Sequence, residues 1–306
     1  MKILFTGGAG FIGSHVVDRY ISDGHSVIVV DDLSTGRSEN LSPDAQFHQL
    51  DIRSKEAAEL IVKEKPEIIN HHAAQIDLRR SVKEPLLDAE INILGLINLM
   101  EAAVKANSIK KVIFASTGGA IYGDAKVIPT AEDYPAWPVS PYGVAKLTSE
   151  HYLNYYQAIH KIPFISLRYG NVYGPRQNPE GEAGVVAIFS QKMMRGEQLI
   201  INGDGTQTRD YVYVSDIVDA NQAALKREIS GIYNIGTGVE TDVNTIFKKL
   251  AQILTPDTKE VHGPEKEGEQ RRSALNCAKA KSDFDWEAKV TLDEGLKKTA
   301  AFFQEA

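Results

Sequence analysis

Residues 2–31, which read KILFTGGAGFIGSHVVDRYISDGHSVIVVD, decide the fold of this 306-residue chain. The apolar stretch Lys2–Thr6 predicts a short buried strand, and Phe11–Asp23 has the periodicity of an amphipathic helix. Ser26–Val30 predicts a second buried strand. A strand, a glycine-rich turn, a helix and another strand in this order are typical of the first unit of a doubly wound sheet, whose turn binds a dinucleotide.

The turn itself carries three glycines. Gly7, Gly10 and Gly13 lie three residues apart, and such glycines allow the backbone to approach a pyrophosphate at the helix N-terminus. Asp31 ends the second strand, 18 residues after Gly13, where a carboxylate would bind the two ribose hydroxyls of NAD. The same carboxylate would repel the 2′-phosphate of NADP. Arg37 could soften that preference, but the sequence favours NAD.

Beyond this unit, predicted strands and helices alternate as in a doubly wound sheet. Between Pro175 and Gly184, prolines and glycines interrupt the alternation, and later elements are shorter. The expected fold class is α/β: a Rossmann-type doubly wound parallel sheet over residues 1–174, with returning elements near 211–236, and a smaller C-terminal α/β substrate-binding lobe over 175–306. The expected strands are Ile68–His72, Val112–Ser116, Phe164–Tyr169, Leu199–Ile201, Tyr211–Val214 and Ile232–Ile235, and the expected helices are Asp88–Lys105, Tyr142–Ile159, Val186–Arg195, Ser215–Lys226, Thr241–Leu254 and Leu292–Phe303.

The composition is that of a soluble enzyme of the cytoplasm. A net charge of −7 argues against nucleic-acid and anionic-membrane partners. The single cysteine, Cys277, excludes an intramolecular disulfide, and the eight histidines are too scattered for a metal site. The first strand leaves no room for a signal peptide, and no apolar run approaches the roughly 20 residues that span a bilayer.

The segment SPYGVAK, residues 140–146, carries the second chemical signal. Tyr142 and Lys146 are four residues apart, so they lie on one face of the predicted helix. A phenol has an ordinary pKa near 10 and is a poor base at neutral pH, but an ammonium group and a cationic nicotinamide ring would stabilise the phenolate. The pair therefore predicts a catalytic base that works beside a dinucleotide.

The motifs together resemble a known family. They include TGGAGFIGSH at residues 6–15, FASTGGAIYGD at 114–124, RYGNVYGPRQ at 168–177 and INGDGTQTRDYVYVSD at 201–216. The chain is similar to the extended short-chain dehydrogenase/reductases of the NAD-dependent epimerase/dehydratase family, and among them to the UDP-glucose (UDP-galactose) 4-epimerases. This resemblance implies an isomerase that binds NAD and a UDP-sugar, oxidises carbon 4 of the hexose transiently, and interconverts UDP-glucose and UDP-galactose.

The resemblance also implies roles for individual residues. Thr117, at the end of the strand before the tyrosine helix, would donate to the 4-oxygen of the sugar, with Ser116 beside it as a further catalytic residue. The histidines at positions 71 and 72 are interpreted as strand-end packing. The implied cofactor contacts are Gly7, Gly10, Phe11, Ile12, Gly13, Asp31, Asp32, Leu33, Ser34, Thr35, Gly36, Asp51, Ile52, Ala73, Ala74, Gln75, Asn92, Tyr142, Lys146 and Tyr169.

On the substrate side, Arg209 would clamp the diphosphate, because its fork binds phosphate bidentately. Lys266 stands where such epimerases carry an arginine, and Asn202 stands where an aromatic residue often stacks on uracil. Ser273 stands where a tyrosine would exclude an acetamido group, so the pocket is expected to admit N-acetylated sugars as well. The implied substrate contacts are Thr117, Tyr142, Asn171, Val185, Val186, Ile200, Ile201, Asn202, Arg209, Lys266, Glu269 and Ser273.

Three alternatives to an epimerase remain open at this point. A nucleotide-sugar dehydratase or decarboxylase shares the first oxidation, but dehydratases carry an Asp–Glu pair after the catalytic threonine, whereas this chain has Gly118 and Gly119. A simple NAD-dependent dehydrogenase would release its cofactor at each turnover. A non-catalytic NAD-binding sensor would not need the threonine, tyrosine and lysine. The resemblance further implies a homodimer, in which the helices Asp88–Lys105 and Tyr142–Ile159 form a four-helix bundle.

Overall fold

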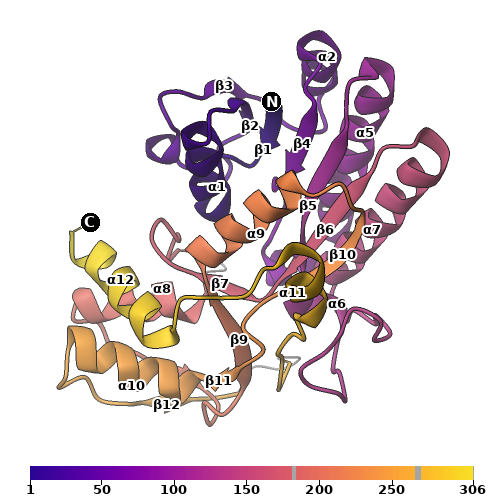
Figure 1. The fold of residues 1–306 in the computed structure, drawn as a ribbon. Helices are drawn as coiled ribbons and strands as arrows, with labels where there is room; N and C mark the ends of the chain where they lie inside the picture. Colours follow the sequence, from indigo (N-terminus) through magenta and orange to yellow (C-terminus); the bar gives the residue numbers. More distant parts are fainter. Residues whose placement is uncertain (181–183, 266–269, 306) are drawn as a thin grey trace.

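A parallel sheet of seven strands forms the centre of the computed structural model, which describes residues 1–180, 184–265 and 270–305 (Figure 1). The strand order is β10-β6-β5-β4-β1-β2-β3, and every neighbouring pair runs parallel. The order reverses on either side of β1, so the carboxyl ends of β1 and β4 form the switch point where such sheets bind ligands. The expected α/β class is confirmed. The bounds are β1 Lys2–Thr6, β2 Ser26–Asp31, β3 Gln46–Gln49, β4 Ile68–His71, β5 Lys111–Thr117, β6 Phe164–Tyr169 and β10 Gly231–Ile235.

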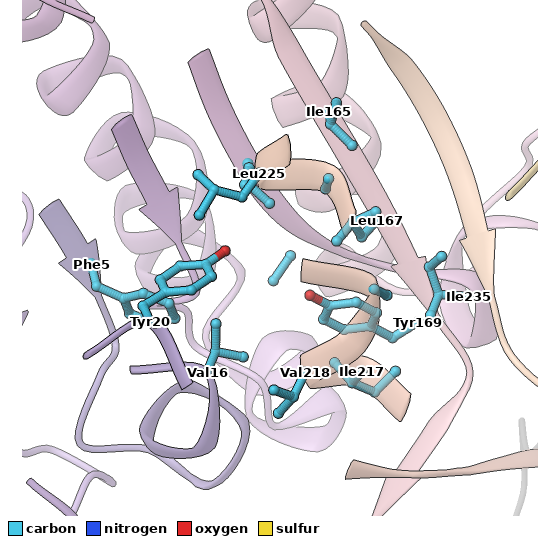
Figure 2. Packing of buried hydrophobic residues seen from close by; sticks show 14 of the residues in the cluster. Phe5, Val16, Tyr20, Ile165, Leu167, Tyr169, Ile217, Val218, Leu225 and Ile235 are labelled. Carbon is cyan, nitrogen blue, oxygen red and sulfur yellow. The ribbon is translucent and has the colours of Figure 1, made fainter. Parts of the chain in front are cut away.

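Helices cover both faces of this sheet because its strands are apolar on both sides. On one face α1 (Phe11–Ser22) and α9 (Val214–Lys226) pack side by side, with α11 (Ala278–Phe284) near the β10 edge. On the other face lie α2 (Lys55–Glu64), α5 (Gly95–Ala106) and α7 (Pro141–His160). Figure 2 shows the first of these layers: Phe5 of β1, Tyr20 of α1 and Leu167 of β6 are buried among residues of α9.

The helix that was expected at Asp88–Lys105 is present, but it contains a π-helical turn. It begins as α4 (Pro85–Ala89), continues through the π-helix η2 (Glu90–Leu94) and ends as α5. Single π-helical turns inside α-helices frequently accompany functional sites. The other short elements are η1 (Ser38–Asn40), α3 (Leu78–Lys83) and α6 (Gly118–Ile121).

The later elements form a smaller group with a core of its own. Helices α8, α10 and α12 pack on one another at the end of the molecule away from α2 and α5 (Figure 1). They cover a three-stranded sheet of order β11-β9-β7, and β8 pairs with β12. The bounds are β7 Asn171–Tyr173, α8 Val185–Met194, β8 Ile201–Asn202, β9 Thr208–Tyr213, β11 Glu240–Asp242, α10 Val243–Leu254, β12 His262–Gly263 and α12 Leu292–Glu305.

Most differences from the expected elements fall where side chains are polar. β3, with the sequence QFHQ, lies at the sheet edge and has no apolar run to predict it. A strand is expected at Leu199–Ile201. The structure has β8 at Ile201–Asn202 instead, because these two residues pair with β12. No helix in the described ranges is long and apolar enough to cross a bilayer.

Candidate active site

The glycine turn between β1 and α1 requires its glycines. Gly7 has φ +75°, and a Cβ there would lie 2.6 Å from the Ala73 nitrogen. A Cβ on Gly13 would lie 2.1 Å from the Gly7 carbonyl oxygen. Gly10 caps α1 without any side-chain hydrogen bond, so the first amide groups of the helix are donors for an external anion.

Asp31, at the end of β2, lies against this turn. Its Oδ2 accepts a hydrogen bond from the Ala9 amide at 2.9 Å and its Oδ1 accepts one from the Leu33 amide at 2.9 Å. Burial raises the pKa of Asp31, and the two amide donors oppose that shift. A Cβ on Gly36 would lie 2.8 Å from Asp31 Oδ1, so the following loop closes over the carboxylate. These residues fit the pyrophosphate and ribose of a dinucleotide. The neighbouring Asp32, Ser34 and Thr35 are exposed.

The segment after β4 is held by buried amides. Asn92 Oδ1 accepts from the Gln75 amide at 2.9 Å, and Asn92 Nδ2 donates to the Gln75 carbonyl and to Asp88 Oδ1, both at 3.0 Å. Gln75 Nε2 also donates to Asp88 Oδ1, at 3.0 Å. Gln75 and Asn92 are expected cofactor contacts, but in the structure the Asn92 side chain binds the Gln75 backbone and both side chains bind Asp88, so they hold the loop that carries Ala73 and Ala74.

The expected packing role of His71 and His72 is confirmed. His71 Nδ1 lies 2.6 Å from Thr6 Oγ1, its ring stacks on Phe114, and burial lowers its pKa. His72 stacks on Phe5, and burial lowers its pKa to about 3. Both rings are therefore neutral at physiological pH.

Two expected cofactor contacts have side chains in the core. The Tyr169 hydroxyl lies 3.2 Å from His72 Nε2 and accepts from Asn221 Nδ2 at 2.8 Å, and Figure 2 shows its ring among core residues. Ile52 is 3% exposed and packs in the layer beneath α2 and α5. Asp51, beside it, binds Arg53 at 2.6 Å. The side chains of Tyr169 and Ile52 therefore take part in packing the two faces of the large sheet.

Helix α7 presents the tyrosine and lysine. Ser140 caps it by accepting from the Gly143 amide at 3.2 Å. Lys146 Nζ donates to the Ala115 carbonyl at 2.9 Å and lies 5.9 Å from the centre of the Tyr142 ring. Lys146 is 3% exposed, whereas Tyr142 is half-buried. The expected juxtaposition of the two side chains is present.

The electrostatics of the pair differ from the expectation in one respect. Burial lowers the pKa of Lys146 to about 8, while the carboxylates of Asp88 and Glu150 oppose that shift. The pKa of the Tyr142 phenol is raised, first by burial and then by Asp88. The protein groups alone therefore do not produce the expected phenolate. A cationic nicotinamide ring beside the phenol would act in the required direction.

Thr117 is the last residue of β5, and its side chain lies near that of Asn171, an expected substrate contact. A Cβ on Gly119 would lie 3.6 Å from Asn171 Oδ1 and 3.9 Å from Thr117 Oγ1, so the two side chains flank one spot. Within the described ranges the Thr117 hydroxyl makes no hydrogen bond, and neither does that of Tyr142. Ser116 differs: its hydroxyl donates to Glu150 Oε1 at 2.7 Å in the interior. This arrangement does not support the expected catalytic role of Ser116, because its hydroxyl proton is donated to Glu150.

The residues of the expected uridine slot divide into a buried pair and a more exposed group. Val186 and Ile201 are each 1% exposed and belong to the core of the smaller lobe, because successive residues of a strand face opposite sides and successive residues of a helix point in different directions. Ile200 is exposed, and Val185 and Asn202 are half-buried. The side chains that can face a base are therefore Val185, Ile200 and Asn202.

The diphosphate and sugar residues lie on neighbouring segments. Arg209 is the second residue of β9, and its guanidinium donates to the Thr208 carbonyl at 2.8 Å. The Thr208 amide donates to the Arg271 carbonyl at 3.0 Å, which brings the segment of Ser273 beside this strand. Ser273 is 7% exposed. Lys266 and Glu269 lie outside the described residues.

Sequence reasoning missed two buried carboxylates near the lysine. Asp88 is 1% exposed and Glu150 is 2% exposed. The available signal was positional: Glu150 stands four residues after Lys146 and eight after Tyr142, on the face that a helix buries. Among the described residues, no group of three or more metal-binding side chains is present.

Comparison with known proteins agrees with this geometry. The model of the NAD dependent epimerase/dehydratase family matches residues 3–236. A UDP-glucose 4-epimerase of Mycolicibacterium smegmatis is 44% identical over 311 residues, which cover 99% of this chain and 99% of the relative. The structure of UDP-glucose 4-epimerase from Thermotoga maritima with UDP-glucose has 50% identity and a TM-score of 0.97, covering 100% of this chain and 99% of that chain. The Thermus thermophilus UDP-glucose 4-epimerase in complex with NAD has 40% identity and a TM-score of 0.95, with 100% of both chains covered.

Proposed function

Because the chain belongs to the NAD-dependent epimerase/dehydratase family, we propose that it is an epimerase that interconverts UDP-glucose and UDP-galactose with bound NAD. One observation carries the proposal. Tyr142 and Lys146 face the end of β5, where Thr117 is followed by two glycines instead of side chains that could remove water from a sugar. An enzyme equipped only to take and return a proton and a hydride regenerates its substrate or the 4-epimer.

Each residue of the site has a separate role in the reaction. NAD, when bound, supplies the acceptor and donor of the hydride. Tyr142 takes the proton of the 4-hydroxyl group, and Thr117 holds the same oxygen through a hydrogen bond. Lys146 keeps a positive charge beside the phenol and would bind the ribose. After the oxidised sugar has turned about its bonds to the diphosphate, Tyr142 returns the proton on the opposite face.

The glycine turn would hold NAD throughout the cycle. The amides of Phe11, Ile12 and Gly13 would bind the pyrophosphate, and Asp31 would bind the ribose hydroxyls. On the substrate, Arg209 would bind the diphosphate, Asn171 a sugar or phosphate oxygen, and Val185, Ile200 and Asn202 the uracil. Firm binding of UDP and loose binding of the hexose would let the oxidised sugar turn without leaving.

The direct test is product analysis. The purified protein is incubated with UDP-glucose, and in a second sample with UDP-galactose, and each mixture is followed by NMR at the anomeric proton. We expect both samples to reach the same mixture of the two sugars, without added NAD, and denaturation to release NAD from the protein. Net formation of NADH, or of a sugar that has lost water or carbon dioxide, would contradict the proposal and favour a dehydrogenase, dehydratase or decarboxylase.

A finer proposal concerns the range of sugars. Ser273 is small and lies in a segment that runs beside β9, so the sugar pocket would have room for an acetamido group at carbon 2. We propose that UDP-N-acetylglucosamine and UDP-N-acetylgalactosamine are also interconverted, with UDP-glucose and UDP-galactose as the primary pair.

We also propose that two chains form a homodimer through α5 and α7, in the cytoplasm. Apolar side chains are exposed along this surface, at Leu94 in η2 and at Val144, Tyr155 and Ile159 in α7. Pairing of these helices with those of a second chain would give a four-helix bundle and bury the exposed side chains. Light scattering coupled to size-exclusion chromatography should give twice the chain mass, and Ile159→Lys should give the monomer. A monomeric wild type would contradict the proposal.

A further inference from the structure

A third polar side chain continues the stripe of Tyr142 and Lys146 on α7. Glu150 follows Lys146 by four residues, one helical turn further on, and it is 2% exposed. A carboxylate so deeply buried needs several hydrogen-bond donors. The proton and hydride transfers described above give it no role.

Glu150 is bound by four donor groups from the neighbouring strands β5 and β6. Its Oε1 accepts from Ser116 Oγ at 2.7 Å, from Ser166 Oγ at 2.8 Å and from Arg168 Nε at 3.0 Å. Its Oε2 accepts from Arg168 Nη2 at 2.6 Å, so the guanidinium binds both oxygens. The Arg168 side chain is 4% exposed. Bidentate geometry of this kind fixes orientation as well as charge.

The hydrogen bonds between α7 and β5 reach Ala115 and Ser116, the two residues that precede the catalytic threonine. Lys146 binds the Ala115 carbonyl, and Glu150 binds the Ser116 hydroxyl. Two successive residues of β5 are therefore attached to two successive turns of α7. Thr117 is the next residue, so its place relative to Tyr142 depends on this double attachment.

The network also reaches the segment after Thr117. Arg168 Nη1 donates to the Tyr122 hydroxyl at 2.8 Å, which donates to Asn234 Oδ1 at 2.8 Å. Tyr122 is the C-cap of α6, the short helix that begins directly after Thr117. Both flanks of the threonine are thus connected to Glu150.

We propose that Glu150 is a positioning residue for the transfer step: it fixes the end of β5, and with it Thr117, against the face of α7 that carries Tyr142 and Lys146. The inference rests on the proposed epimerase function. Glu150 does not touch the reacting atoms and acts through Ser116 and Arg168.

Charge adds a second effect of the same carboxylate. Glu150 raises the pKa of Lys146 and so opposes the lowering by burial. Asp88 acts in the same direction, whereas the two histidines nearby are neutral. The titratable and charged groups around this part of the site are Tyr142 and Glu150 on α7, Asp88 on α4, His71 and His72 at the end of β4, and Arg168 on β6.

The test uses two serines whose hydroxyl groups bind the same oxygen of Glu150 from different strands. Ser116→Ala and Ser166→Ala each remove one buried hydroxyl that donates to Glu150 Oε1, but only Ser116 adjoins Thr117. We expect Ser116→Ala to lower kcat at least about tenfold with KM within about twofold, since a small misplacement of a reacting group can cost up to about 100-fold. Ser166→Ala should retain kcat within about twofold. Melting temperature and retained NAD are measured for both variants.

Glu150→Gln allows a second measurement, the pH dependence of kcat/KM, which would not change if Glu150 had a purely structural role. Loss of the carboxylate lowers the pKa of Lys146, so the alkaline limb of kcat/KM should move to lower pH, and it should stay in place in Ser166→Ala. Equal kcat in the two serine variants would overturn the positioning role, whether or not Glu150→Gln folds. If Glu150→Gln folds and the alkaline limb of its kcat/KM profile stays in place, the role is overturned as well. A wild type that does not epimerise in the same assay would refute the proposed function itself, a result separate from any difference between the serines.

Discussion

Lys146 Nζ lies 5.9 Å from the centre of the Tyr142 ring, and its hydrogen bond goes to the Ala115 carbonyl instead of the phenol oxygen. Without a hydrogen bond to the phenol, the lysine can influence the tyrosine only through its charge, and its direct bond holds the end of β5. Because its own pKa is lowered to about 8, the charge is available at neutral pH but is lost in moderately alkaline solution.

Replacement of Tyr142 by Phe should abolish epimerisation while the fold and the bound NAD remain. A general base contributes about 100- to 10,000-fold to a rate, so a loss in that range is expected. Tyr152→Phe removes an exposed hydroxyl from the same helix and is the matched control. If Tyr142→Phe kept more than about a tenth of the wild-type kcat, the assigned proton transfer would be wrong.

Replacement of Asp31 by Ala should weaken the retention of NAD and narrow the preference for NAD over NADP, because the carboxylate that repels a 2′-phosphate is removed. The measurement is reconstitution of the stripped protein with each cofactor. Asp44→Ala makes the same change of charge at an exposed position outside the implied cofactor contacts and should leave the preference as it is. An unchanged ratio in Asp31→Ala would contradict the ribose assignment.

The activity should fall on the alkaline side of neutrality. The pKa of Lys146 is lowered from 10.5 to about 8, so the ammonium form is complete well below that pH and disappears as the pH rises through it. We expect kcat/KM for UDP-galactose to follow this loss. Lys146→Arg, if it retains measurable activity, should lack the decline, because a guanidinium keeps its charge to a pH above about 12. A wild-type profile that is flat up to about pH 10 would exclude Lys146 as the group that titrates.

Replacement of Ser273 by Tyr should suppress turnover of UDP-N-acetylgalactosamine and spare that of UDP-galactose. The aromatic ring would occupy the space that an acetamido group needs. Ser273→Ala, which removes the hydroxyl without filling the space, should keep both activities. The gatekeeper role fails if the wild type rejects the acetylated sugar, or if Ser273→Tyr leaves the ratio of the two kcat/KM values unchanged.

Contiguous motifs allowed more to be predicted than scattered side chains did. The bounds of β1 and β6 agree with the prediction, because each is a short segment rich in apolar residues, as strands buried inside a parallel sheet are. Helical spacing likewise placed Tyr142 and Lys146 on one face. In both cases the information lies within a few neighbouring residues.

The side chains that the structure places differently from expectation meet partners that are distant in sequence. The Ser116 hydroxyl is committed to a carboxylate 34 residues away, and Asn92 binds the backbone of Gln75, 17 residues away. Val186 and Ile201 face the core of the smaller lobe because of packing between α8, α10 and α12. Local sequence shows that such residues are polar or apolar, but the group they meet is decided by the whole fold.

The position of β10 in the large sheet has a consequence for how the protein is made. This strand pairs with β6, although 61 residues lie between the end of β6 at Tyr169 and the start of β10 at Gly231. During synthesis, a chain that has emerged only as far as residue 174 leaves one side of β6 without its partner. Unpaired strand edges bind one another and promote aggregation. The nucleotide-binding half should therefore be unable to fold stably until the ribosome has passed residue 235, so a fragment that ends at residue 174 should accumulate as insoluble protein.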